Sequence, residues 1–258
     1  MVECGRLIST EQALKLIHVP KVDSRYWAAI TLASVFGTNL GDFYAHESGL
    51  GVGWGLLLLA AVVVAALLAE RIDTLAHQLY YWLAIIIIRT GATNIADYLA
   101  FRVRIPGLAL TLGLAALIAV FGWRSARAAG QRPGGLPDTG ASYWLAMLAA
   151  GVFGTVLGDI CSHAIGQGAS ALILGVLLAL ALLLRRQGVL AMATAYWGTV
   201  AVARTAGTAM GDWLAENKLL NIGLPLSTLL TGAAFVAVLL LWRSRPSTGG
   251  RASLGAAA

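Results

Sequence analysis

Long apolar stretches separated by short polar segments dominate the chain. Stretches such as Gly55–Ala69, Ala171–Leu184 and Gly232–Trp242 contain no charged residue. A helix needs roughly 20 predominantly apolar residues to cross a membrane. The pattern therefore predicts an all-α membrane protein with eight transmembrane helices, at about residues 26–45, 52–69, 76–100, 105–123, 141–163, 168–184, 188–215 and 222–242.

The eight predicted helices are of two alternating kinds. The even-numbered ones consist almost entirely of Ala, Leu and Val, whereas the odd-numbered ones contain nearly all the polar residues. A polar residue in a membrane helix is costly unless it serves packing or function. Function is therefore expected in the odd-numbered helices.

One motif recurs in all four odd-numbered helices. A Tyr-Trp pair is followed by a Thr 11 residues after the Trp and by an Asp 15 residues after it. The members are Trp27, Thr38 and Asp42; Trp82, Thr93 and Asp97; Trp144, Thr155 and Asp159; and Trp197, Thr208 and Asp212. Each unit contains two helices, so every unit enters the membrane in the same direction. The sequence predicts four parallel two-helix repeats around an axis along the membrane normal.

The repeats alternate in their polar residues. The first and third contain Gly-Thr-x-x-Gly-Asp and add His46 and His163 four residues after the Asp. The second and fourth have Arg89 and Arg204 seven residues after the Trp. We therefore expect two pseudosymmetric four-helix halves, residues 26–127 and 141–243, joined by a cytoplasmic linker at 128–140. An interfacial N-terminal segment at 1–25 and a disordered tail at 244–258 complete the predicted division.

These repeated units resemble a bacterial membrane family described as a repeat of unknown function. The resemblance rests on the Trp and on the Gly-Thr-x-x-Gly-Asp or Arg-Thr-x-x-Thr-x-x-x-Asp stretch, and it extends from Tyr26 to Trp242. It implies the same eight-helix arrangement, but it implies no activity.

The basic residues predict the orientation of the chain. With the N-terminus in the cytoplasm, 13 Lys and Arg lie on the inner side and 3 in the outer loops. This positive-inside bias places both termini in the cytoplasm. The resemblance to a bacterial family implies that the membrane is a bacterial inner membrane. The positive-inside bias explains the net charge of +6 without a nucleic-acid partner. Residues 9–17 predict a short helix at the membrane surface. No cleavable signal peptide is expected. In the predicted topology, Cys4 and Cys161 lie on opposite sides of the membrane.

Steps of four residues turn a helix by only about 40°, so Trp, Arg, Thr and Asp share one helical stripe. The tryptophans are expected to be interface anchors of an aromatic belt. The expected substrate or ion pathway consists of Asp42, Asp97, Asp159, Asp212, Thr38, Thr93, Thr155, Thr208, Arg89 and Arg204.

The two His residues lie one turn beyond an Asp of the same helix. Carboxylate and imidazole are ligands for Mn²⁺ or Zn²⁺. The pattern predicts a divalent-metal site at Asp42, His46, Asp159 and His163, with no other cofactor required. An interfacial location of both imidazoles near lipid headgroups remains the alternative.

Four carboxylates against two arginines predict a cation pathway. The leading hypothesis is a secondary transporter or exporter of a cation, for example a divalent metal exchanged for protons. The alternatives are a cation channel with an aspartate ring, a transporter of an anionic or organic substrate held by Arg89 and Arg204, a bis-His haem protein, and a purely structural or signalling membrane protein. No catalytic motif is present, so an enzyme is not expected. The expected partners are the lipid bilayer and a small ion or molecule, and the sequence does not determine the oligomeric state.

Overall fold

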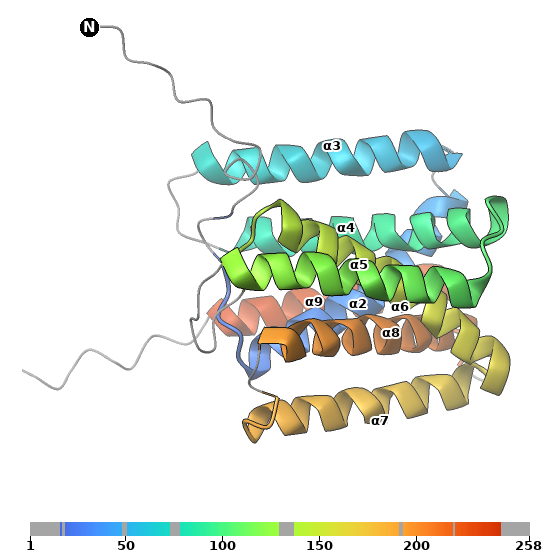
Figure 1. Cartoon of the computed structure of the whole chain (residues 1–258). Coiled ribbons are helices and arrows are strands. Elements are labelled where there is room, and N and C mark those ends of the chain that lie inside the picture. The colour runs from blue at the N-terminus through green and yellow to red at the C-terminus, as the bar shows by residue number, and fades with distance from the viewer. Residues whose placement is uncertain are drawn as a thin grey trace, which may run out of the picture.

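The computed structural model describes residues 16, 19–47, 51–72, 78–128, 137–190, 193–218 and 220–243. Within these ranges the chain forms eight α-helices and no strand (Figure 1). They are α2 (Ser24–Glu47), α3 (Gly51–Ile72), α4 (Leu79–Asp97), α5 (Gly107–Ala128), α6 (Ala141–Ile165), α7 (Gln167–Arg186), α8 (Ala193–Glu216) and α9 (Gly223–Arg243). A π-helical turn, η1 (Tyr98–Arg102), extends α4. All eight predicted segments are helical.

Six of the described helices are long and apolar enough to cross a membrane: α3, α4 with η1, α5, α6, α7 and α9. The remaining two, α2 and α8, contain more polar residues along their inner faces, among them Thr31, Ser34 and Asn39 in α2. The predicted N-terminal surface helix, apart from Leu16, and the tail at 244–258 lie outside the described residues.

Local signals define several helix ends. Asp23 precedes α2, and its Oδ1 accepts hydrogen bonds from the backbone N–H groups of Arg25 and Tyr26, both at 2.9 Å. This is the N-cap interaction that satisfies free donors in the first turn. At the other side of the bundle, Gly166 has a φ of +86°, which permits the abrupt reversal between α6 and α7.

The four helices that carry the repeated motif form a closed ring. α2 packs on α4, α4 on α6, α6 on α8, and α8 returns to α2. The contact between α8 and α2 joins helices from the two predicted halves. The described residues of both halves therefore form one bundle around a common axis.

The apolar helices surround this ring in a cyclic order. Each packs mainly on the ring helix of the next unit: α3 on α4, α5 on α6, α7 on α8, and α9 on α2. Figure 1 shows α3 and α7 on opposite sides of the bundle. Their outer surfaces expose large apolar side chains, including Trp54, Leu57, Leu172 and Val176. An exposed apolar surface of this extent fits a lipid environment.

Small residues allow the ring helices to approach closely. A Cβ added at Gly154 would lie 2.6 Å from the backbone carbonyl carbon of Arg204, and one at Gly41 would lie 2.7 Å from Cβ of Thr93. Such small-residue contacts are the usual basis of tight helix packing in membranes. They hold the repeated polar side chains against the central axis.

Candidate functional site

Four tyrosine hydroxyls close one end of the axis. Tyr26, Tyr81, Tyr143 and Tyr196 are almost fully buried. Their hydroxyl oxygens form a closed cycle, with distances of 3.0 Å for Tyr26–Tyr81, 2.6 Å for Tyr81–Tyr143, 3.0 Å for Tyr143–Tyr196 and 2.6 Å for Tyr196–Tyr26. Each hydroxyl can donate to one neighbour and accept from the other. We call this cycle the tyrosine ring, and this end of the bundle the tyrosine end.

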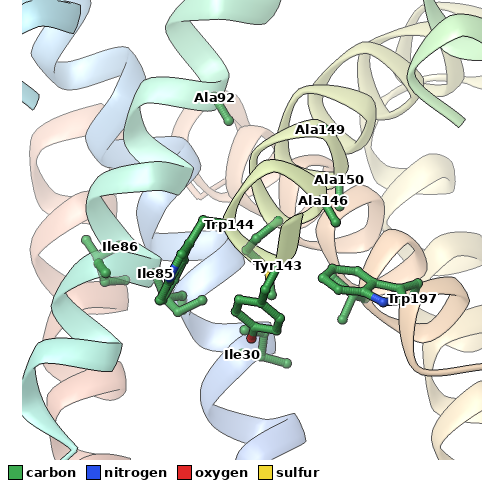
Figure 2. Close-up of a cluster of buried hydrophobic side chains, with 14 of the residues drawn as sticks. Ile30, Ile85, Ile86, Ala92, Tyr143, Trp144, Ala146, Ala149, Ala150 and Trp197 are labelled. Carbon is green, nitrogen blue, oxygen red and sulfur yellow. The ribbon is translucent and has the colours of Figure 1, made fainter. Parts of the chain in front are cut away.

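The four tryptophans support the tyrosine ring from outside. Each Tyr packs on the Trp of a neighbouring unit, at ring-centroid distances of 5.4–5.9 Å. Figure 2 shows Tyr143 between Trp144 of its own helix and Trp197 of α8. Aromatic pairs at this separation stabilise beyond the area that they bury.

This packing differs from the expected role of the tryptophans. Trp27, Trp82, Trp144 and Trp197 are only 3–7% exposed. An aromatic-belt anchor must face the headgroup region. These side chains instead face the protein interior, because the Tyr before each Trp occupies the axis and brings the Trp between two ring helices.

Arg204 lies next along the axis. Its side chain is fully buried, its Nη1 donates to Ser34 Oγ at 3.2 Å, and its Nη2 contacts Met147 Sδ at 3.2 Å. Glycine at position 154 allows this residue to pack directly on α6. A fixed positive charge therefore lies between the tyrosine ring and the middle of the bundle.

The guanidinium group of Arg89 occupies the centre of a second ring. Nη1 donates to the hydroxyls of Thr93 and Thr155, at 2.9 and 3.0 Å. Nη2 donates to the hydroxyls of Thr38 and Thr208, at 2.5 and 2.6 Å. The two terminal nitrogens have four N–H bonds in total, and all four repeated threonines accept one. We call these four hydroxyls the threonine ring.

A cavity opens beyond the threonine ring, at what we call the aspartate end. Its volume is about 270 Å³, and it is lined by the four threonines and by all four repeated aspartates, Asp42, Asp97, Asp159 and Asp212. Glu216, Gln167, His163 and Phe101 also line it. The ten pathway residues predicted from the sequence thus separate into two sets: eight line this aspartate cavity, and two arginines follow it along the axis.

The lining of the aspartate cavity is strongly acidic. Five acidic side chains line it, four Asp and Glu216, and the lining includes no Lys or Arg. Gln167 of α7 donates from Nε2 to Glu216 Oε2 of α8 at the rim. Arg89 lies on the other side of the threonine hydroxyls, to which its guanidinium donates. Acidic side chains gathered in one cavity give it a negative electrostatic potential.

The predicted metal site is only partly described. His163 lines the cavity but is exposed, and its Nδ1 is 2.7 Å from the backbone carbonyl oxygen of Asp159 on the same helix. The side chain of His46 is outside the described residues. Among the side chains that are described, no three His, Cys, Asp or Glu converge as ligands of one metal ion. The metal site stays a prediction.

The sequence interpretation missed the tyrosine ring. The Tyr-Trp pair is part of the repeat, but the sequence analysis predicts a role only for the Trp. The only sequence signal was the repeat of Tyr at one position in all four units, and helix rotation decides whether such a residue faces the axis. Phe101, Gln167 and Glu216 had no repeated pattern that could identify them.

Two segments of the chain match the model of a family described as Repeat of Unknown Function (DUF347). The matches cover residues 25–71 and 195–247, which correspond to α2 with α3 and to α8 with α9. These are the first and last two-helix units. No curated protein and no solved structure matches the chain.

Proposed function

We propose that this chain, whose first and last two-helix units match the DUF347 repeat family, is a membrane transporter of a small cation that binds in the aspartate cavity. The observation that carries the proposal is the convergence of four repeated aspartates on one cavity. Intramembrane carboxylates are costly and are retained where ions or protons move.

The proposed orientation follows from the charge distribution. Eight spans with both termini in the cytoplasm would place the tyrosine end inside and the aspartate end outside, in a bacterial inner membrane. The conformation then corresponds to an outward-facing state. The threonine ring with Arg89, then Arg204, and finally the tyrosine ring separate the cavity from the cytoplasm.

A transporter fits this axis better than a channel. A conducting pore needs a continuous path with weak successive sites. Here two buried guanidinium groups and a closed cycle of hydroxyls occupy the axis in succession. A cation that reaches Arg89 meets a like charge, so passage requires a change of conformation. Protonation of the aspartates is a natural way to couple that change to a proton gradient.

The anionic-substrate hypothesis has less support. All four terminal N–H bonds of Arg89 are used by threonines. An anion would have to displace those hydroxyls after passing five acidic side chains. Both steps oppose binding.

Uptake into proteoliposomes tests the proposal. We expect cation uptake by the wild type and at least a tenfold loss after Asp42→Asn and Asp159→Asn are combined, because a neutral amide cannot bind the cation or release a proton. The matched control is Asp23→Asn, which removes one carboxylate outside the cavity and keeps an N-cap acceptor. Unchanged uptake after all four cavity aspartates are neutralised would show that the proposal is wrong.

A further inference from the structure

The chemistry of the aspartate cavity carries an inference about its substrate, which rests on the proposed function. We infer that the substrate is a small organic cation with a guanidinium-type or ammonium head, and that the guanidinium of Arg89 occupies the substrate's head-group site in the described conformation. The following contacts support this assignment.

The threonine ring is already a guanidinium site. Four hydroxyls from four different helices each accept one terminal N–H bond of Arg89. Three of these threonines also donate to a backbone carbonyl one turn earlier, as Thr38 does to Ser34 at 2.9 Å. Their lone pairs therefore face the axis. A planar head group with several N–H donors fits this ring, whether it belongs to Arg89 or to a substrate.

The cavity directly continues this ring toward the aspartate end. The same four threonines line the aspartate cavity, so a ligand that enters from that end reaches the hydroxyls next to the carboxylates. A cationic head group at this level would donate hydrogen bonds to the hydroxyl oxygens, and the aspartates would compensate its charge. It would also compete with Arg89 for the same acceptors.

The size and lining of the cavity fit an organic body. Its volume of about 270 Å³ is far larger than the ~30 Å³ share of one water molecule. Phe101, Ala215 and Leu224 contribute apolar surface to its wall. A phenyl ring beside carboxylates can contact the methylene groups or the charge of an organic cation.

A dehydrated divalent metal fits the same cavity less well. Such an ion needs several ligands at about 2.0–2.6 Å. Within the described part of the chain, no three acidic, His or Cys side chains approach one point closely enough. The aspartates surround a wide space rather than one coordination centre.

Competition between substrate and Arg89 gives the site a coupling device. While Arg89 fills the threonine ring, the axis is closed. When a substrate head group takes the hydroxyls, the side chain of Arg89 must leave them. Binding and the state of the barrier are therefore linked through one set of four acceptors.

The test uses the full-length protein in liposomes, with methylguanidinium and Mn²⁺ as probes. We expect methylguanidinium to be taken up and to raise the apparent Tm, and Mn²⁺ in equal concentration neither to be taken up nor to compete. Thr155→Val should weaken methylguanidinium binding, whereas Thr155→Ser should retain it, because serine keeps the hydroxyl that accepts a guanidinium N–H bond in this structure.

The substitution Arg89→Lys tests whether Arg89 occupies the head-group site or only stabilises the fold. A lysine has three donors and no planar fork, so it leaves at least one threonine acceptor open to the ligand. We expect methylguanidinium to bind about tenfold more tightly, the equivalent of roughly one hydrogen bond. If Arg89 only supports the fold, the Arg89→Lys protein should be less stable than the wild type and should show no gain in affinity for methylguanidinium.

The outcomes distinguish the two proposals. Aspartate-dependent uptake of Mn²⁺ without methylguanidinium would overturn the organic-cation inference and leave the cation transporter intact. If the protein takes up neither probe and no inorganic cation, both the organic-cation inference and the cation-transporter proposal are wrong. Unchanged affinity in Arg89→Lys would overturn the assignment of the threonine ring as the head-group site.

Discussion

The two ends of the axis are built from the same four helices and have opposite chemistry. At the tyrosine end, four neutral hydroxyls satisfy one another in a closed cycle, and four indoles exclude water around them. At the aspartate end, five acidic groups line an open cavity, and the guanidinium of Arg89 is bound to the threonine hydroxyls behind it. The polar groups at the tyrosine end complete one another's hydrogen bonds, whereas those at the aspartate end gather like charge. Under the proposed function, the tyrosine end closes the axis and the aspartate end binds the cation.

The largest effect on stability is expected from a change in the packing of the ring helices, which both ends share. A Cβ at Gly207 would overlap Cβ of Ser34 and approach the backbone of α2 to 3.0 Å, so Gly207→Ala must separate α8 from α2. We expect a loss of about 3 kcal/mol or more in stability, measured as a lower apparent Tm and a smaller yield of monodisperse protein.

A matched control for this substitution lies on the same helix. Gly198 has no atom within 4 Å of an added Cβ, so Gly198→Ala should leave the Tm unchanged or raise it slightly. Equal Tm values for the two variants would contradict the tight contact between α8 and α2.

A change at the aspartate end should alter binding more than stability. Asp159→Asn removes one of the cavity carboxylates and preserves the shape of the side chain. We expect cation affinity to fall by about tenfold to a hundredfold, the cost of losing one charged interaction. Equilibrium binding and the Tm should be measured on the same preparation, and a large fall in Tm with normal affinity would reverse the roles of the two ends.

A change at the tyrosine end should have the opposite result. Tyr143→Phe removes a hydroxyl that contacts both Tyr81 and Tyr196 and keeps the aromatic contact with Trp197. We expect a loss of about 1–3 kcal/mol in stability, with cation affinity at the aspartate cavity within twofold of the wild type. A tenfold loss of affinity would show that the two ends are not separable.

The smallest effect is expected at the rim of the cavity. His163 is exposed, and its Nδ1 contacts the backbone carbonyl of Asp159. His163→Gln should therefore change the affinity for Mn²⁺ or for an organic cation by less than about twofold, since exposed groups contribute little. A tenfold loss specific to Mn²⁺, measured by titration, would support the metal site predicted from the sequence.

Much of the site could be predicted from the linear repeat. Thr155 and Asp159 belong to one stripe because four residues turn a helix by about 40°, and equivalent stripes on parallel helices must face the same axis. The aspartates and threonines of the predicted pathway do line one cavity. Helix periodicity is a local property, so the order of residues along the chain is sufficient to define it.

Other features depended on how the helices pack. Arg89 and Arg204 occupy the same position in their repeats, yet one fills the threonine ring and the other contacts Ser34 and Met147. Trp144 could equally have faced lipid, and it faces the interior because α6 presents that side to α4. The rotation of each helix about its own axis decides which neighbours a side chain meets, and only the packing of all eight helices sets that rotation.

The sequence by itself thus determined the helices, the repeated stripe and its acidic character, because these follow from hydropathy and from a period of 3.6 residues. Only the tertiary structure decided that the tyrosines close one end, that Arg89 takes all four threonines, and that the carboxylates remain around an open cavity. Those relations join residues far apart in the chain, such as Thr38 and Thr208 on the two nitrogens of one guanidinium. They arise from the closure of the helix ring, which no local pattern specifies.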